Sequence, residues 1–581
     1  MKKARKHRPP KPKGRRKQRQ LPKSRTPPPR DETAASASPF GGFDFTAGSQ
    51  DSAALVARAR DRLRAGQPRE ALPLLRRVLA EDPNNADALN LSGIAAFQTG
   101  QAEQALDLLQ TAAAFAPLNA EVKTNLGNVL AALGRTGEAA DAYRDAMAAG
   151  PAYAEAPFNL GILMEAAGDA GEALIAYNRT LDIEPGHAGA HQGRGNALKA
   201  LRRLNEAKAA YLAALRHNPA LPEALTNLAA VLQELGDFEA AEARCREALQ
   251  LAPDLAEAQY NLAIALQEQG RYREANALYE AVLEAQPGHA AAALNIAYGL
   301  QQLGELDSAA VMLEKAIAID PAFAKAHVNL ADLHLQRGDP EAALAVCRAY
   351  LSAHPGSTDM LAFEAIALWD KGAEAQARRL TDLERFIQPV RIKPPEAYSG
   401  LEAFNEALSA HVLSHPTLTF APQSHATREG RHSGELLQGE KGPIADLERI
   451  ILDAAEAYRA QLGTDPGHPF LAAPPRNWTL SVWGVVMQAA GHQIPHIHPA
   501  AWLSGVYYAS VPDVVSSRSR AGWIEFGRPP DHFHNRREPE TRSIQPEPGL
   551  MVLFPSYFYH HTVPFEAEGT RISIAFDLMP A

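Results

Sequence analysis

The stretch AEVKTNLGNVLAALGRTGEAADAYRDAMAAGP, residues 120–151, contains a pattern that recurs through much of the chain. Its apolar residues recur at helical spacing in two runs, one around Leu126 and one around Tyr143. Gly134 lies between the two runs, where it lets the chain turn. Pro151 lies just after the second run, where a proline cannot extend a helix. The stretch therefore predicts two paired helices joined by a tight turn.

The glycine and the proline of this stretch recur every 34 residues. The prolines are Pro83, Pro117, Pro151, Pro185, Pro219, Pro253, Pro287, Pro321 and Pro355. The glycines are Gly66, Gly100, Gly134, Gly168, Gly236, Gly270, Gly304, Gly338 and Gly372. Only Arg202 interrupts the glycine series. A fixed period of this length predicts an array of about ten helix–turn–helix units over residues 51–390.

This pattern resembles the tetratricopeptide repeat, and the resemblance implies an all-α superhelix with a concave inner face. Two residues before the small residue of the first helix, six repeats carry an asparagine: Asn125, Asn159, Asn227, Asn261, Asn295 and Asn329. Asparagine is a poor helix former, so its recurrence inside helices needs a reason. The series is similar to the asparagine ladder of the O-linked N-acetylglucosamine transferase repeats. That similarity implies that the amides bind the backbone of an extended polypeptide. Hydrogen bonding between repeats, or inheritance from duplicated units, is the alternative reason.

Composition favours a soluble protein of several domains. The chain has 581 residues, of which 22% are charged and 46% apolar. No apolar run reaches the roughly 18 residues that a membrane span needs, and no apolar signal core opens the chain. The only two cysteines, Cys245 and Cys347, occupy a slot that holds tyrosine in neighbouring repeats. We expect both to be buried fillers in a protein of the reducing cytoplasm.

The first 50 residues follow different rules. Residues 1–30 contain 14 Lys or Arg and no acid, although the net charge of the whole chain is −9. Such a proline-rich, basic segment cannot bury enough apolar surface to fold, so we expect a disordered tail, joined to the array by a linker over residues 31–50. The tail either solubilises the protein or contacts nucleic acid or ribosomes electrostatically. It has no interleaved aromatic residues that would stack on bases.

After residue 390 the 34-residue period stops. Two helical stretches, FNEALSAHVL and IADLERIILDAAEAYRAQL, are separated by a segment that we expect to be a loop, around Thr427 and Arg428. From Trp478 onward short β-branched and aromatic runs alternate with Gly and Pro: WTLSVWGVVMQ, WLSGVYYASV, GWIEF, GLMVLFP and RISIAFDL. These runs predict a β-sandwich or small barrel with flanking helices over residues 391–581.

Histidines carry the chemical signal of this domain. His496 and His498 lie two residues apart in GHQIPHIHPAAWLSGVYY, so on a strand both would project from one face. FPSYFYHHTVPF offers His560 or His561 about 64 residues later. Imidazoles suit iron, zinc, copper or nickel, so these residues predict a metal site. A second HxH, in DHFHNRR at residues 531–537, lies among charges without strand texture and is interpreted as a solvated loop.

Close to the carboxy terminus, Arg571 and Ser573 share one strand face in RISIAF. A buried arginine there could make a bidentate contact with a carboxylate. These segments, in this order, resemble the double-stranded β-helix (jelly roll) of 2-oxoglutarate/Fe(II)-dependent dioxygenases, and in particular a bacterial branch often fused to tetratricopeptide repeats. The resemblance implies Fe(II) held by His496 and the distal His560. It also implies 2-oxoglutarate anchored by Arg571, assisted by Ser573 and Tyr508.

The chain departs from the family pattern at the third metal ligand. His498 stands where such enzymes usually place Asp or Glu, so three imidazoles would leave Fe(II) with a net charge of +2. Three arrangements remain open. His498 binds the metal directly, a distant acid such as Asp513 or Glu525 completes the site, or water fills the position.

The leading hypothesis is a 2-oxoglutarate- and Fe(II)-dependent dioxygenase that hydroxylates a polypeptide captured by the repeats. The alternative is a non-catalytic interaction scaffold whose β domain binds a metal or ligand without turnover. Glycosyl transfer, which only the asparagine ladder favours, needs two nucleotide-binding domains, and about 190 residues are too few for them. No Gly-rich phosphate loop precedes a helix, which also argues against a sulfotransferase.

Overall fold

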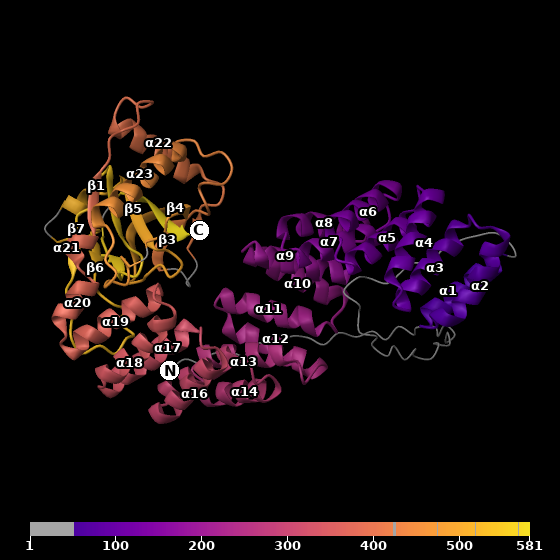
Figure 1. Cartoon of the computed structure of the whole chain (residues 1–581), viewed down its shortest axis with the longest axis horizontal. Coiled ribbons are helices and arrows are strands. Elements are labelled where there is room, and N and C mark those ends of the chain that lie inside the picture. The colour runs from indigo at the N-terminus through magenta and orange to yellow at the C-terminus, as the bar shows by residue number, and fades with distance from the viewer. Residues whose placement is uncertain (1–51, 422–425, 473, 517–518, 567–568) are drawn as a thin grey trace, which may run out of the picture. The chain divides into compact units, whose positions relative to one another are not determined.

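A computed structural model describes residues 52–581 apart from 422–425, 473, 517–518 and 567–568 (Figure 1). It divides into two compact units, one that ends at His217 and one that spans Asn218–Ala581. The predicted disordered tail, residues 1–50, lies outside the described residues. The predicted division at residue 390 falls inside the second unit and stays a prediction.

The first unit is built from five helix pairs. In chain order the helices are α1 (Ser52–Arg64), α2 (Pro68–Glu81), α3 (Ala86–Gln98), α4 (Ala102–Phe115), α5 (Ala120–Ala132), α6 (Thr136–Ala149), α7 (Glu155–Ala166), α8 (Ala170–Ile183), α9 (Ala188–Ala200) and α10 (Leu204–His217). Each pair corresponds to one 34-residue period of the sequence. The helix–turn–helix prediction is therefore confirmed for this unit.

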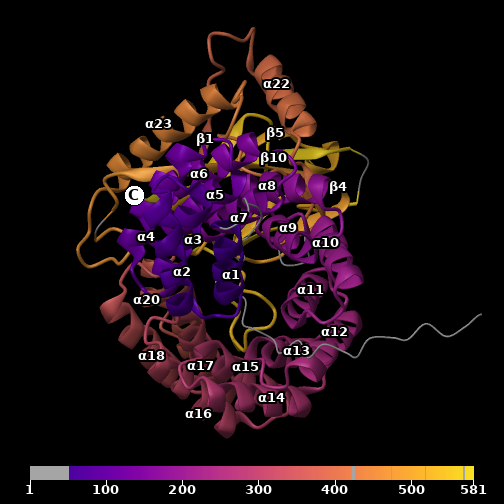
Figure 2. The ribbon, with the colours of Figure 1, turned by 90° about the vertical axis from the view of Figure 1, so that its right-hand side faces the viewer.

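The second unit begins with five more pairs, which follow one another in chain order (Figure 2). They are α11 (Pro222–Glu234), α12 (Phe238–Leu251), α13 (Ala256–Glu268), α14 (Tyr272–Ala285), α15 (Ala290–Gln302), α16 (Leu306–Ile319), α17 (Ala324–Arg337), α18 (Pro340–Ala353), α19 (Thr358–Lys371) and α20 (Glu374–Leu380). The short helix α21 (Leu383–Phe386) leads from the last repeat into the β domain.

The glycine period sets the turn inside each pair. All nine glycines of the series have left-handed backbone angles, with φ between 68° and 82°. Arg202, which interrupts the series, has φ of 60°. The turn thus needs the left-handed conformation even where the residue carries a Cβ, which costs about 1 kcal/mol relative to glycine.

The first helix of a pair carries a small residue, such as Gly127 or Gly161, where it packs against the second helix. This residue sets how closely the two helices approach. A Cβ placed on Gly127 of α5 would lie 2.5 Å from the ring of Tyr143 on α6. Gly161 stands in the same relation to Tyr177, at 2.6 Å. In these repeats a buried tyrosine ring therefore fills the space that the missing side chain leaves, which explains why glycine and tyrosine recur together.

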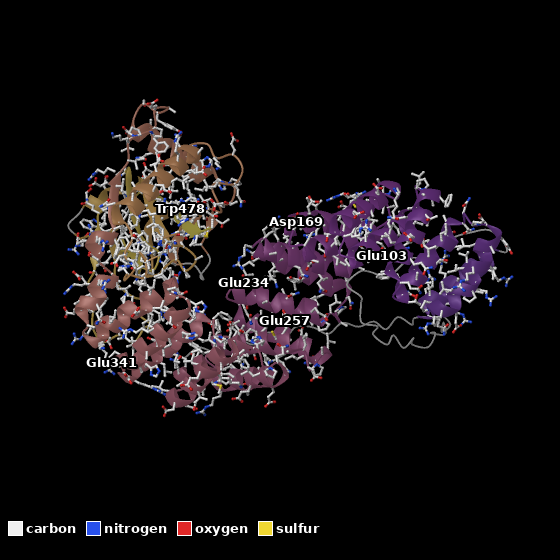
Figure 3. The ribbon with its side chains drawn as sticks, viewed as in Figure 1. Glu103, Asp169, Glu234, Glu257, Glu341 and Trp478 are labelled. Carbon is white, nitrogen blue, oxygen red and sulfur yellow. The ribbon has the colours of Figure 1, made fainter. Side chains whose placement is uncertain are left out.

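The β domain holds two antiparallel sheets. The larger has the strand order β1 (Gln388–Arg391), β8 (Leu550–Pro555), β5 (Leu503–Ser510), β10 (Arg571–Pro580), β4 (Trp478–Gln493), β3 (Thr427–His432) and β2 (Thr419–Phe420). The smaller has the order β7 (Arg542–Ile544), β6 (Ile524–Phe526) and β9 (His560–Thr562). A short 3-10 helix, η1 (Asp513–Ser516), follows β5. This curled antiparallel sheet confirms the predicted β class, and Figure 3 labels Trp478 where β4 begins.

Two helices, α22 (Leu401–Ser414) and α23 (Ile444–Leu462), flank the sheets where the sequence predicts them. Successive side chains of a strand point to opposite faces of the sheet, and this alternation explains how α22 packs against β5. Tyr507 of β5 donates its hydroxyl hydrogen to the amide oxygen of Asn405 on α22, whereas the next residue, Tyr508, lines a pocket on the other face. One face of the large sheet therefore contacts helix, and the other faces the site described below.

Several strands of the sheets lie outside the runs that the sequence analysis predicted, and two of them, β3 and β1, pair with long strands of the larger sheet. Thr427–His432, expected as a loop, is β3 and pairs with β4. Gln388–Arg391 is β1 and pairs with β8. Both segments lack the β-branched and aromatic texture of a strand. They are extended because the sheet offers them hydrogen-bonding partners, so tertiary context outweighs local propensity.

One hydrophobic core runs through the last repeats and the β domain. It extends without interruption from Ala331 on α17, through Phe363 on α19, to Leu578 on β10. Cys347 belongs to the same core, and Cys245 is buried in α12; both are unpaired, as the sequence analysis expected. Burial raises the pKa of the Cys245 thiol to about 12. Among the described helices, none has the length and apolar character to cross a membrane.

Candidate metal and cosubstrate site

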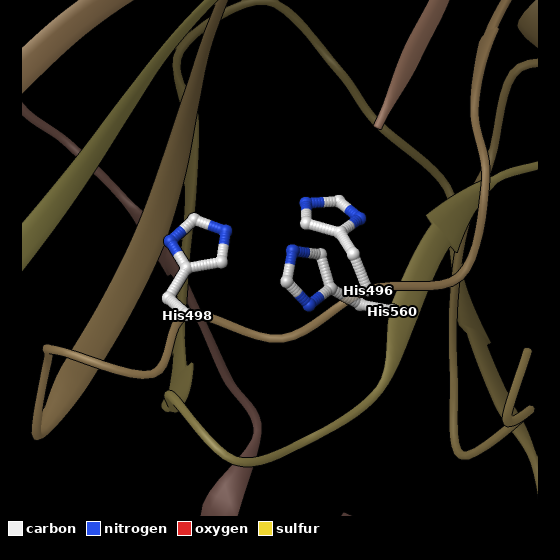
Figure 4. Close-up of side chains that lie close together, drawn as sticks. All are labelled: His496, His498 and His560. Carbon is white, nitrogen blue, oxygen red and sulfur yellow. The ribbon is translucent and has the colours of Figure 1, made fainter. Parts of the chain in front are cut away.

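Three histidines converge from two segments of the β domain. His496 and His498 lie between β4 and β5, and His560 opens β9 (Figure 4). His496 and His560 form an isolated antiparallel bridge, in which each backbone N–H donates to the other's carbonyl at 3.1 Å. The three residues each offer one ligand atom, and these atoms lie within 4.8 Å of one another. This arrangement can hold a single metal ion.

Each of the three rings is oriented by a hydrogen bond at Nδ1. His496 donates from Nδ1 to the carbonyl of Ile494 at 2.9 Å, and His560 donates to the carbonyl of Phe558 at 3.0 Å. Because a carbonyl oxygen only accepts, Nδ1 carries the proton in both rings and Nε2 keeps its lone pair. The rings are therefore held with the nitrogen that a metal needs left open.

Burial keeps these rings uncharged. It lowers the pKa of His496 to about 3, with a further contribution from neighbouring His498. It also lowers the pKa of His560 well below its usual value, again with help from the other two histidines. Since only a neutral imidazole binds a metal, both rings are ready to act as ligands at neutral pH.

The third ring is oriented by a carboxylate. Nδ1 of His498 donates to Oδ1 of Asp577 at 2.7 Å. Ser504 donates to the same oxygen at 2.6 Å, and its hydroxyl is 2.8 Å from that of Ser556. The sequence analysis missed Asp577. The signal was available, because Asp577 lies on the same face of β10 as Arg571 and Ser573 by strand alternation.

The other candidates for a third ligand lie elsewhere. Asp513 is exposed in η1. Glu525 of β6 accepts hydrogen bonds from Arg528 and Ser543, and its nearest approach to a histidine is 3.8 Å, to Nε2 of His561. His498 is thus the residue that the fold brings to His496 and His560.

A buried arginine lies in the same pocket. Arg571 is only 2% exposed, and it donates to the carbonyl of Gly522 at 3.1 Å and to the hydroxyl of Tyr508 at 3.3 Å. Its Nε is buried with no partner among the described residues. Burial lowers the pKa of this guanidinium. A buried cation with an unsatisfied donor fits an anionic ligand that enters the pocket, such as a carboxylate.

The histidines and the arginine line one pocket of about 410 Å³. Its polar lining includes His496, His498, His560, Tyr508, Arg571, Ser573 and Asp577. Ser573 is buried and lies opposite Tyr508 in the pairing of β10 with β5. All six residues that the sequence analysis assigned to the metal and the cosubstrate therefore surround one cavity. The volume is in the range of small-molecule sites in proteins.

The ladder asparagines are placed differently. Asn125 donates to Asn90 at 2.9 Å and Asn159 donates to Asn128 at 2.9 Å. Asn261 donates to the carbonyl of Thr226 at 3.4 Å, and Asn295 donates to the hydroxyl of Tyr260 at 3.1 Å. Each of these four amides thus reaches the preceding repeat. The alternative interpretation, hydrogen bonding between repeats, expects this pattern, and peptide binding stays a prediction.

Comparison with protein families agrees with this geometry. A family model described as "Putative 2OG-Fe(II) oxygenase" matches residues 481–577, which include every pocket residue named above. Tetratricopeptide-repeat models match residues 62–127, 124–188, 188–221, 210–243, 232–297 and 300–366. The chain is a tetratricopeptide-repeat protein with a 2OG-Fe(II) oxygenase-family domain.

Solved structures resemble parts of the repeat array. YrrB, described as a TPR protein with an unusual peptide-binding site, is 28% identical over 32% of this chain and 96% of its own, with a TM-score of 0.30. MamA is 27% identical over 28% of this chain and 94% of its own, with a TM-score of 0.26. PilF of Pseudomonas aeruginosa is 20% identical over 36% of this chain and 94% of its own, with a TM-score of 0.33. No curated protein matches the chain.

Proposed function

We propose that the β domain is a 2-oxoglutarate- and Fe(II)-dependent dioxygenase and that it hydroxylates a polypeptide held by the repeat array. The observation that carries the proposal is the single pocket that joins three ring nitrogens to a buried, incompletely paired arginine. The family to which the domain belongs implies both cofactors.

His496, His498 and His560 would hold the iron. Their Nδ1 atoms are already used, so each would bind through Nε2. Asp577 would hold the proton on Nδ1 of His498 and orient that ring with Nε2 toward the metal. The negative charge that the family usually supplies at the third ligand is thus present one hydrogen bond further out. A carboxylate at this place would partly offset the net charge of +2 that three neutral ligands leave on the iron.

Arg571 would bind the cosubstrate. Its free Nε lies in the pocket that also contains the three histidines, and Tyr508 and Ser573 add hydroxyl groups beside it. When bound, iron and 2-oxoglutarate together supply the oxidation chemistry, because decarboxylation of 2-oxoglutarate to succinate provides two electrons for the reduction of oxygen. The apolar residues Ile524 and Phe554 line the same pocket and limit the access of water.

The repeat array supports a polypeptide substrate, because such repeats generally mediate protein–protein interaction. On α15, Asn295 is only half-buried, and Tyr298, three residues on and so on the same helix face, is 40% exposed. On this face the ring of Tyr298 is partly open to a partner, although the amide of Asn295 also contacts Tyr260 of the preceding repeat. We also propose a cytoplasmic location, since both cysteines are unpaired. Contact of the tail with nucleic acid or ribosomes stays a prediction.

The test is reconstitution of the purified chain. With Fe(II), 2-oxoglutarate and oxygen, we expect succinate formation that requires all three, and no succinate from the His560→Ala variant. The alternative, a scaffold that binds metal without turnover, is favoured by the absence of a carboxylate among the three ligands. It would be correct if the wild-type chain binds metal with all three histidines but forms no succinate and consumes no oxygen.

The substrate itself can be trapped with the His496→Ala variant, which should retain captured polypeptide without modifying it. Mass spectrometry of the captured chains, before and after exposure to the wild-type enzyme, should show the added mass of one oxygen atom. Asn295→Ala and Asn329→Ala should weaken capture and leave succinate formation without substrate unchanged. If capture is normal in both variants, the ladder serves only the packing of the repeats.

A further inference from the structure

The last repeats and the β domain meet through buried contacts. The hydrophobic core is continuous from α17 to β10. The ring centroids of Phe363 on α19 and of Phe533, in the segment between β6 and β7, are 5.1 Å apart. Three sets of hydrogen bonds within this unit join the repeat helices to the β domain near the metal-site histidines. Two lie on the segments that carry His498 and His560, and the third lies on a segment that follows a strand paired with His560.

The first contact lies beside His498. Thr358, the first residue of α19, is 5% exposed and donates its hydroxyl hydrogen to the carbonyl of Pro499 at 2.7 Å. Pro499 directly follows His498, whose own N–H donates to the carbonyl of Ser556 at 3.0 Å. The backbone at His498 is thus held by the β domain on one side and by a repeat helix on the other.

The second contact lies beside His560. Tyr557, three residues before it, is 1% exposed and donates its hydroxyl hydrogen to the carbonyl of Leu380 at the end of α20, at 2.7 Å. The short turn between β8 and β9 is therefore hydrogen-bonded to the last repeat. Because His560 begins β9, the position of this turn decides where its ring lies.

The third contact is made by the segment 531–537, which the sequence analysis interpreted as a solvated loop. Much of it is exposed, yet Asp332 of α17 accepts from the backbone N–H of His534 at 2.9 Å and contacts its Nδ1 at 2.7 Å. Asp370 of α19 accepts from the N–H of Arg537 at 3.1 Å. This segment follows β6, where Phe526 is paired with His560. The correction is that this loop is anchored to the repeats.

From these contacts we propose that the last two repeats position the metal-binding histidines and form part of the metal centre. Thr358 acts on His498 through Pro499, and Leu380 acts on His560 through Tyr557. Asp332 holds the strand beside His560 through the segment 531–537. The inference rests on the proposed function, since it concerns the same three histidines. Partners that orient metal ligands typically change metal affinity about 10- to 100-fold when they are removed.

Binding of a metal to positioned ligands must in turn stabilise what positions them. Co(II) alone, which has a visible absorption when bound by imidazoles, is a suitable probe. In the wild-type full-length chain, Co(II) should slow amide hydrogen exchange in α19 and in the segment 531–537. It should leave exchange in α5, in the other compact unit, unchanged.

Substitutions sharpen the test. Thr358→Val removes the hydroxyl and keeps the branched shape, and it should weaken Co(II) binding about tenfold. Thr358→Ser keeps the hydroxyl and should bind Co(II) within about twofold of the wild type. The matched control is Thr124→Val, which removes an equally buried hydroxyl that bonds only within α5, and it should not change Co(II) binding.

A second pair tests the contact beside His560. Tyr557→Phe should weaken Co(II) binding, whereas Tyr350→Phe, which removes another buried tyrosine hydroxyl bonded to a carbonyl, should not. Unchanged Co(II) affinity in Thr358→Val and Tyr557→Phe, with no change of exchange in α19, would overturn the positioning role alone. If the wild-type chain binds no metal, the proposed function fails together with it.

Discussion

The repeat array and the β domain bring contacting residues together in different ways. In the array, such residues lie within one helix pair, as with Gly127 and Tyr143, or about one period apart, as with Asn125 and Asn90. In the β domain, His496 and His560 meet from segments 64 residues apart, and Asp577 reaches His498 from a third segment. A period in the sequence can therefore be translated directly into contacts, whereas a convergent site depends on strand pairing across the whole domain.

The same difference separates the two sets of predicted binding residues. The histidines present their free nitrogens to a shared cavity and use the other nitrogen for support. Four of the ladder asparagines donate hydrogen bonds from their side-chain amides to the preceding repeat. Convergence around a cavity is therefore a stronger indication of a binding site than recurrence along the sequence.

The largest effect should come from removing a metal ligand. His560→Ala should lower metal affinity more than about 100-fold. This loss is larger than the roughly 10- to 100-fold loss that follows when a residue that only orients a ligand is removed. The helical signal of the array should stay unchanged, because the ring contacts that the described residues make with His560 all lie within the β domain. Co(II) titration and circular dichroism measure the two properties. If the variant loses both metal binding and helical signal, the folding of the array depends on the β domain.

Arg571→Met should weaken the binding of 2-oxoglutarate and leave the metal site in place. We expect 2-oxoglutarate affinity to fall roughly 100-fold, about 2.7 kcal/mol, since a charge-assisted contact in a buried pocket is lost. Calorimetric titration with 2-oxoglutarate measures this change, and Co(II) titration serves as the control.

The same variant should also stabilise the protein in the absence of cosubstrate, because a buried cation with an unpaired Nε is replaced by an apolar chain. Thermal unfolding without ligand checks this expectation. A lower melting temperature would mean that the contacts to Gly522 and Tyr508 outweigh the cost of burying the charge.

Asp577→Asn tests whether the carboxylate behind His498 matters for the metal. The amide oxygen can still accept from Nδ1, but the negative charge is gone, so metal affinity should fall about tenfold. Asp513→Asn, at an exposed position in η1, is the matched control and should bind metal normally. Equal affinities for all three proteins would exclude a role of Asp577 in the metal site.

In the array, Gly127→Ala should lower the free energy of unfolding by about 1–3 kcal/mol, because its Cβ would lie 2.5 Å from the Tyr143 ring. Gly137→Ala, where nothing lies within 4 Å, should instead raise it by about 0.5–1 kcal/mol through helix propensity. Urea unfolding of both variants measures the difference. If the Tyr143 ring is the reason for a small residue at position 127, the two variants must change the free energy of unfolding in opposite directions.

The smallest effect is expected at the interrupted turn. Arg202→Gly should raise the free energy of unfolding by up to about 1 kcal/mol, since it relieves a left-handed conformation at φ of 60°. Gly134→Arg places the same residue type in the equivalent turn and should lower it by a similar amount. If both changes are neutral, the turn tolerates a Cβ and the glycine period has another cause.

The repeat region was predictable because its information is local. Helix pairs, turns and the left-handed residues follow from a period of glycine, proline and apolar positions. The β runs from Trp478 onward were predictable for a similar reason, since alternation and β-branched content are local signals. Thr427–His432 was not, because a strand of polar residues is extended through its pairing with neighbouring strands, here β4 and β2.

From the order of residues alone, this protein could be assigned as a helical repeat array followed by a β domain with clustered histidines and a late arginine. The folded chain shows in addition that His498, and neither Asp513 nor Glu525, lies with His496 and His560, and that Asp577 orients it. Only the tertiary structure joined the segment 531–537 to α17 and α19. The physical reason is that a ligand set and its supports are defined by distances of a few ångströms between segments far apart in the chain. No local pattern encodes such distances, and strand pairing and a shared core impose them.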